Sequence, residues 1–275
     1  KKVIRTRYLT IIAIALIIIA LGIVTNNYIT ESSMIYDHSF KDIRGVFFEM
    51  ISYQNGILIF MVPLALILLV IDNWYNKFKN GNIKHYLLRM SYKDFKKKLI
   101  KSVLKISILY PLILFALLLI SVILTKGQND FSSINIYSSY YNVWAYHNFF
   151  LYILGLTILL YMQGLLTSSF ALIYLNKVKN KTLTIIFSYL TWLIVLVALH
   201  IVPYMLINAL FNYQINSNYL RFYILQVYFD TSDNYFIYLL CLLVFTIIML
   251  GINFFQIYKT KEKVVLDNEK EMEAK

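Results

Sequence analysis

Charged residues are scarce in this chain, and those present are kept apart from its long apolar runs. Only 15% of the 275 residues are Asp, Glu, Lys or Arg, whereas soluble domains carry about 25%. Hydrophobic residues make up 60% of the sequence. They gather in runs of about 17 or more residues, which is enough to cross a hydrocarbon core of roughly 30 Å. The sequence therefore predicts an all-α integral membrane protein rather than a globular domain with a large core.

Cysteine and clustered histidine are lacking as well. The one cysteine, Cys241, lies in an apolar run, which excludes an intrachain disulfide and a Cys-rich zinc site. The four histidines are scattered at His38, His85, His147 and His200. No phosphate-binding G-x-x-x-x-G-K-[ST], no H-E-x-x-H and no G-x-S-x-G motif occurs. We therefore expect no metal site and no catalytic site, and if ATP is used, another chain hydrolyses it.

Six apolar runs predict six transmembrane helices in a single transmembrane domain over residues 1–275. The expected spans are about 8–24, 57–74, 106–124, 149–175, 182–202 and 235–255. The first follows a basic segment, and we interpret it as a retained anchor rather than a cleaved signal peptide. Pro63 and Pro111 lie within spans two and three, where neighbouring helices can satisfy the carbonyl groups that a proline leaves free.

Basic residues determine the predicted orientation, because loops on the cytoplasmic side of a membrane carry an excess of Lys and Arg. The segments 1–7, 76–105, 176–181 and 256–275 hold 22 of the 26 basic residues. Both termini are therefore expected to be cytoplasmic, and 256–275 forms a charged tail. Orientation and anionic lipid headgroups explain the net charge of +12 better than nucleic acid does.

The segment 76–105 is the most basic part of the chain, with ten Lys or Arg and one acidic residue, Asp94. Its apolar residues recur at helical spacing and predict a short amphipathic helix at about 82–90. Ser91 followed by Asp94 three positions later is typical of a capping box, so a new helix should begin at Tyr92 and run into span three. The short helix could lie on lipid, lead into the span or dock on a soluble partner.

Ionisable groups inside a bilayer are functional candidates by default, and the expected spans contain almost none. Asp72 lies at the end of span two, where pairing with Lys77 or Lys79 is expected. Gln163 lies near the middle of span four among small and hydroxyl residues that allow close helix contact. Helix packing is the simpler interpretation of Gln163, and a polar contact in a translocation path is the alternative.

The connection between spans five and six is apolar and aromatic, although it is predicted to lie on the outer side. Span five is expected to end at Pro203. The segment 203–234 is too hydrophobic for an ordinary wet loop, so we expect it to re-enter the membrane or to lie on its surface.

The block from Asp72 to Lys101, DNWYNKFKNGNIKHYLLRMSYKDFKKKLIK, joins spans two and three. It contains an acidic residue, a glycine, a short apolar helix, a basic residue and a serine at which a new helix begins. The positions concerned are Asp72, Gly81, Ile83, Leu87, Arg89, Ser91 and Lys98. With six spans and a hydrophobic segment between spans five and six, this block resembles the permease subunit of a type-2 ABC exporter, in which it forms the amphipathic coupling helix.

The resemblance implies a dimer of permeases, identical or related, each docked on a separate nucleotide-binding ATPase subunit. The docking face would comprise Ile83, Tyr86, Leu87 and Met90, with Arg89 as a polar contact. ATP and Mg would be bound by the partner, and this chain would bind no cofactor and would not itself be an enzyme. The expected function is export of a hydrophobic or amphipathic cargo (a peptide, lipid or drug-like molecule) across a bacterial cytoplasmic membrane.

Three other classes of protein stay open. A membrane scaffold, immunity or sensor protein would need no ATPase partner. A membrane-embedded enzyme acting on lipids would need charged residues or histidines clustered near one interface, and in this sequence they are scattered. A secondary transporter is disfavoured because the sequence shows no evident internal repeat and few ionisable groups within its spans.

Overall fold

The computed structural model describes residues 43–53, 57–79, 87–127, 147–178, 180–211 and 235–260. The regular structure of these parts is entirely helical. The helices are α2 (Ile43–Tyr53), the π-helix η1 (Ile57–Met61), α3 (Val62–Lys79), α5 (Tyr92–Ser107), α6 (Leu109–Leu124), α9 (Phe149–Lys177), α10 (Lys181–Phe211) and α11 (Tyr235–Lys259). The expected first span, the segment 212–234 and the tail from 261 lie outside the described residues.

Five helical stretches are long and apolar enough to cross a membrane. They are Leu58–Tyr75, Tyr92–Leu124, Phe149–Lys177, Lys181–Leu199 and Leu242–Lys259. These stretches coincide with the expected spans two to six. The prediction of an all-α membrane protein is therefore confirmed for the part of the chain that the structure describes.

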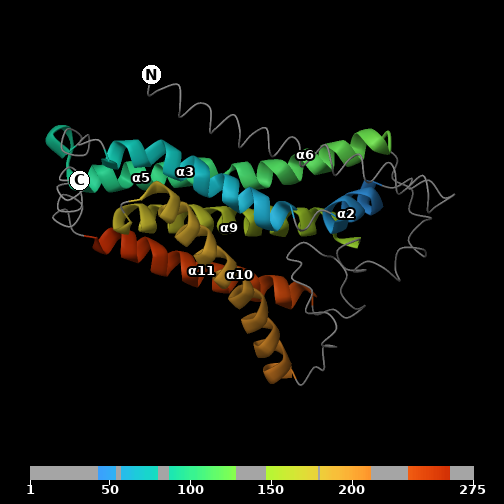
Figure 1. Ribbon diagram of the computed structural model, residues 1–275. Helices are drawn as coiled ribbons and strands as arrows, with labels where there is room; N and C mark the ends of the chain where they lie inside the picture. Colours follow the sequence, from blue (N-terminus) through green and yellow to red (C-terminus); the bar gives the residue numbers. More distant parts are fainter. Residues whose placement is uncertain are drawn as a thin grey trace.

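Helix α9 lies at the centre of the bundle, and α3, α5, α6, α10 and α11 all pack against it (Figure 1). In its second half the side chains are buried on every side, as the successive residues 163–173 show, whereas Phe150 and Leu154 near its start are exposed. A helix that is apolar on every side belongs in the interior of a bundle. The other helices leave large apolar side chains exposed on their outer faces, such as Leu119, Ile194 and Phe255. Exposed apolar surface on this scale suits contact with lipid tails rather than with water.

Two prolines coincide with departures from regular α-helix. Pro63 has no N–H to donate to the carbonyl of Ile59, and the π-helical turn η1 directly precedes α3 at this point. Side chains from neighbouring helices donate to the carbonyls of that turn instead. The indole of Trp192 donates to Ile59 at 3.4 Å, and the Tyr110 hydroxyl donates to Leu58 at 3.0 Å. The expectation that neighbouring helices satisfy such carbonyls is confirmed here.

Pro111 has a similar effect between α5 and α6. It cannot donate to the carbonyl of Ser107, and the helix is interrupted at Ile108. The two helices still continue one another as the single stretch Tyr92–Leu124. The predicted helix from Tyr92 into span three is therefore confirmed, with one interruption that proline chemistry explains.

Helix α10 does not end at Pro203, where the sequence suggested an end, but continues to Phe211. A proline removes a single hydrogen bond from a helix, and here apolar residues on both sides of it continue the helical run. The far end of α10 points away from α9 and α11 (Figure 1).

Candidate functional site

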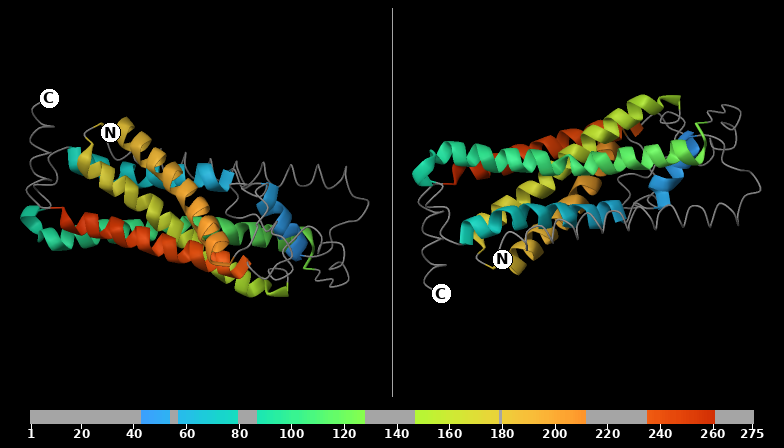
Figure 2. Two further views of the ribbon diagram at one scale, coloured as in Figure 1. Left: turned by 90° about the horizontal axis from the view of Figure 1, so that it is seen from below. Right: turned by 90° about the horizontal axis from the view of Figure 1, so that it is seen from above.

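The lysine-rich ends of five helices meet at one end of the bundle (Figures 1 and 2). Helices α3, α9 and α11 end there, and α5 and α10 begin there. We call these five helix ends the basic end, because their lysines include Lys77, Lys93, Lys177, Lys181 and Lys259. The arrangement agrees with the predicted cytoplasmic side, since segments that are far apart in the sequence bring their positive charges together.

The start of α5 has the cap that the sequence predicts. The backbone N–H of Asp94 donates to the Ser91 hydroxyl oxygen at 3.2 Å, and that hydroxyl donates to the Asp94 carboxylate at 2.6 Å. Ser91 has the extended backbone of an N-cap residue. The helical conformation therefore ends before Ser91, and a new helix starts at Tyr92. The cap at Ser91 holds the preceding residues at a defined position beside the bundle.

The expected docking residues divide into groups in the structure. A helical turn lies at residues 87–89, and Leu87 and Met90 pack against the core of the bundle. Ile83 and Tyr86 lie outside the described residues. Leu88 is 82% exposed, and Arg89 is exposed beside it. Leu88 was not among the sequence candidates, because it lies off the apolar face that the spacing of Leu87 and Met90 defines.

Asp72 pairs with Lys181, a lysine that the sequence did not suggest; of the two that it did suggest, the side chain of Lys79 lies outside the described residues. The Asp72 carboxylate lies 3.1 Å from the ammonium of Lys181, and the Asp72 side chain is only 6% exposed. The expectation of Lys77 is wrong, because residues five apart do not share a helix face. Lys77 instead donates to the side chain of Asn73 at 3.1 Å and lies 4.1 Å from the centre of the Trp74 ring. Burial lowers the pKa of Lys77, and the nearby charge of Lys98 lowers it further.

The start of α5 is also tied to the end of α11. The ammonium of Lys96 donates to the carbonyl of Tyr258, and the hydroxyl of Tyr92 donates to the carbonyl of Thr260 at 3.0 Å. The last carbonyls of a helix have no partner within the helix, so these two donors supply what α11 lacks. We call these two hydrogen bonds the α5–α11 clamp. The clamp places a direct connection between the capped turn at Ser91 and another transmembrane helix.

A line of polar side chains crosses the centre of the bundle. The Ser107 hydroxyl contacts the hydroxyl of Ser168 at 3.3 Å, and the amide of Asn253 donates to Ser169 at 2.8 Å. These contacts join α5 and α11 to α9, and all four side chains are buried. We refer to Ser107, Gln163, Ser168, Ser169 and Asn253 as the polar seam. Hydroxyl and amide groups of this kind hold helices together where water is absent.

Gln163 is the exceptional member of the polar seam. It is fully buried, and neither its side-chain oxygen nor its side-chain nitrogen has a hydrogen-bond partner among the described residues. An unsatisfied buried amide costs about 1–3 kcal/mol. Gly164, the next residue, packs so closely that an added Cβ would lie 3.1 Å from the carbonyl oxygen of Ser107. Close helix packing and an unpartnered amide are therefore both present, and simple packing does not account for the amide.

No group of three His, Cys, Asp or Glu side chains that could hold a metal ion occurs in the described ranges. Comparison of the chain with protein-family models, with curated proteins and with solved structures found no match. The resemblance of residues 72–101 to a type-2 ABC permease therefore stays a prediction from the sequence. The site that the structure offers consists of the exposed turn at the basic end and the polar seam behind it.

Proposed function

We propose that this chain is the transmembrane permease subunit of an ATP-driven exporter in a bacterial cytoplasmic membrane. ATP and Mg bind to a separate ATPase subunit, and a second permease, identical or related, completes the transporter. The observation that carries the proposal is the exposed pair Leu88 and Arg89. It stands on a turn that is anchored by Leu87 and Met90 on one side and by the cap at Ser91 on the other.

An anchored turn can pass movement to the helices, whereas a loose loop cannot. Coupling between distant sites can be carried by a continuous series of packed or hydrogen-bonded groups. From Ser91 such a series runs through Tyr92 and Lys96 to α11, and through Ser107 to α9. A displacement of the turn would therefore be transmitted to α11 and α9 and to the polar seam between them.

The cargo in this proposal is hydrophobic or amphipathic. The buried parts of the described spans carry little charge, and Asp72 and Lys96, the charged residues buried there, both lie at the basic end. The amide of Gln163, in the middle of the bundle, has no hydrogen-bond partner among the described residues, so we assign it a polar contact with the cargo. A peptide or lipid with one polar group among apolar parts fits such a path.

The docking claim is tested by two substitutions on the exposed turn. Leu88→Asp and Arg89→Glu should each reduce retention of the ATPase about tenfold, which is typical of a residue at the centre of an interface. Because Leu87 and Met90 support the bundle, replacing them would confound docking with folding. Lys93→Glu, on the first turn of α5, is the control for Arg89→Glu because it makes the same charge change at an exposed lysine.

Equal loss in Arg89→Glu and Lys93→Glu would show that only overall charge matters and would contradict the docking role of the turn. If Leu88→Asp and Arg89→Glu both left ATPase retention and export unchanged, the docking role of the turn would also be contradicted. A chain that never binds an ATPase would favour the scaffold, immunity or sensor alternative.

A further inference from the structure

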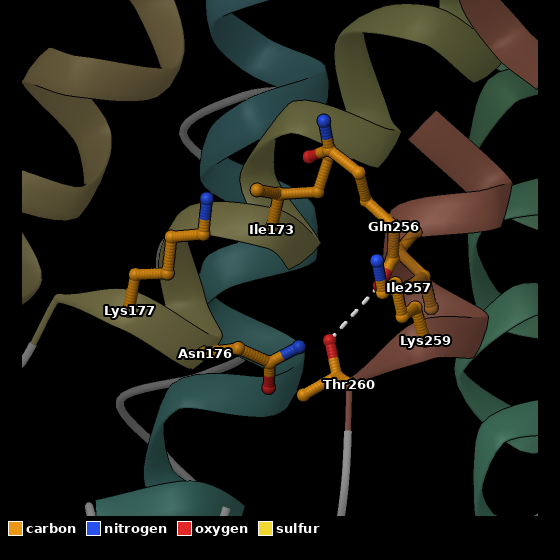
Figure 3. Close-up of a pocket in the computed structure, with 7 residues that line it drawn as sticks. All are labelled: Ile173, Asn176, Lys177, Gln256, Ile257, Lys259 and Thr260. Atoms are coloured by element: carbon orange, nitrogen blue, oxygen red, sulfur yellow. Dashed lines mark hydrogen bonds between the residues drawn. The ribbon is translucent and has the colours of Figure 1, made fainter. Parts of the chain in front are cut away.

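A pocket of about 320 Å³ lies between the last turns of α9 and α11 at the basic end (Figure 3). Ile173 and Ile257, both buried, contribute its apolar part. Its polar lining consists of Asn176 and Lys177 from α9, and Gln256, Lys259 and Thr260 from α11. The pocket therefore combines an apolar base with a polar edge that both helices supply.

The polar lining is suited to a phosphate group. Lys177 and Lys259 bring one positive charge from each helix, and no carboxylate is among the described residues that line the pocket. The side-chain amide of Gln256 adds a neutral donor to the lining. Ammonium and amide donors without a competing acid are the groups that bind phosphate oxygens.

Helix C-termini usually disfavour anions, because their last carbonyls point outward with partial negative charge. At the end of α11 this effect is reduced by the α5–α11 clamp. The carbonyls of Tyr258 and Thr260 accept from Lys96 and Tyr92, so they are not free acceptors. At the end of α9, the Val178 N–H donates to the carbonyl of Tyr174 at 2.8 Å.

Along α11 the exposed side chains change from apolar to aromatic to positively charged, which matches the order of acyl chain, interface and headgroup in a phospholipid. Ile252 and Phe255 are exposed apolar side chains, Tyr258 is an exposed aromatic with a polar tip, and Lys259 follows directly. In a membrane, apolar side chains face acyl chains, aromatic residues lie at the interface, and lysines reach the headgroups. The pocket is thus at the depth where phospholipid phosphates lie.

We propose that this pocket binds the phosphate headgroup of an anionic phospholipid, with the acyl chains lying along the exposed face of α11. Lys177 and Lys259 contact the phosphate, and the amide of Gln256 adds a hydrogen bond. The site requires only that the chain is embedded in a membrane. It does not depend on the proposed transport activity.

The test uses the full chain in nanodiscs that contain equal amounts of phosphatidylglycerol and phosphatidylcholine. Native mass spectrometry measures the ratio of the two lipids that stay bound. Each lysine near a phosphate contributes roughly fivefold in affinity, so Lys177→Gln with Lys259→Gln should lower the preference for phosphatidylglycerol by about 25-fold. The matched control is Lys93→Gln with Lys101→Gln, two exposed lysines of α5 that do not line the pocket.

The proposal expects the control to keep most of the preference, and Lys177→Arg with Lys259→Arg to keep it as well. Equal losses in the pocket and control variants would overturn it, because the basic end as a whole would then attract the lipid. No preference in the unsubstituted chain would overturn it too, and would leave the pocket to another occupant such as residues 261–275. Displacement of the lipid by millimolar inorganic phosphate would show a site for a soluble anion and would also contradict the proposal.

Discussion

At the residue scale, three positions in the centre of the bundle determine how closely its helices approach. Gly164 lets the carbonyl of Ser107 reach α9, and Pro111 has no N–H to give this carbonyl the usual α-helical hydrogen bond. Gln163 lies directly beside this contact with an amide that nothing described satisfies. The small residue Gly164 therefore allows the close packing of α5 on α9. Gln163 lowers the stability of the bundle, and this cost needs a functional explanation.

Gly164→Ala should lower the free energy of unfolding by about 1–3 kcal/mol, because the new Cβ would overpack against the backbone of Ser107. The measurement is thermal or denaturant unfolding of the purified chain in detergent. Gly251→Ala is the control, since a Cβ on that helical glycine meets nothing within 4 Å. It should be neutral or stabilising by about 0.5–1 kcal/mol. Equal destabilisation by both substitutions would contradict the close contact between α5 and α9.

Gln163→Met should raise the free energy of unfolding by about 1–3 kcal/mol, because it removes, at nearly constant volume, a buried amide that no described residue satisfies. On the proposed function it should also reduce export of the cargo. Asn253→Leu is the matched control, a buried amide that donates to Ser169. That change should lower stability by about 1 kcal/mol. If Gln163→Met destabilised the chain and left export unchanged, Gln163 would be a packing residue.

At the scale of elements, side chains from distant parts of the sequence hold the helix ends together. Asp72 joins α3 to the start of α10 through Lys181, and the α5–α11 clamp joins two further helices. The sequence predicted the cap at Ser91, because capping is a local pattern. It missed the partner of Asp72, because that partner lies 109 positions along the chain and no local pattern can indicate it. It assigned Leu87 and Met90 to the docking face, and in the structure both pack against the bundle, since spacing reveals an apolar face but not what covers it.

Asp72→Asn should destabilise the chain by about 1–3 kcal/mol, because it leaves Lys181 without its counter-charge. The cost is below that of a fully buried pair, since the Lys181 side chain is 33% exposed. A double-mutant cycle with Lys181→Met measures the coupling directly, and we expect about 1 kcal/mol or more. The same cycle with Lys77→Met should give a coupling near zero. A larger coupling of Asp72 to Lys77 than to Lys181 would contradict the Asp72–Lys181 pair and support the partner that the sequence suggested.

At the scale of the whole molecule, the described helices form one bundle with an apolar outer surface and one strongly basic end (Figures 1 and 2). Hydropathy and charge were enough to predict the five spans that the structure describes and to indicate which of their ends share a side, because both signals are read directly from the sequence. The centre of the bundle was harder to predict. Every span is apolar, and only the packing shows that α9 is surrounded by the others.

If the basic end is cytoplasmic, as predicted, a membrane-impermeant thiol reagent should reach only positions at the opposite end in intact cells. After Cys241→Ala removes the native thiol, Ser91→Cys at the basic end should react only when the membrane is permeabilised. Lys126→Cys, in the exposed turn after α6 at the opposite end, should react without permeabilisation. The reverse pattern would show that the basic end faces outward, against the usual distribution of positive charge.

The central claim is that this chain works with a separate ATPase. The most direct measurement is purification of the tagged, unsubstituted chain in a gentle detergent, with mass spectrometry of every protein that stays bound and an ATPase assay of the complex. The account predicts a co-purifying soluble subunit that carries a G-x-x-x-x-G-K-[ST] motif, and ATP hydrolysis that depends on it. A chain that purifies alone, and that no candidate ATPase binds on reconstitution, would contradict the account.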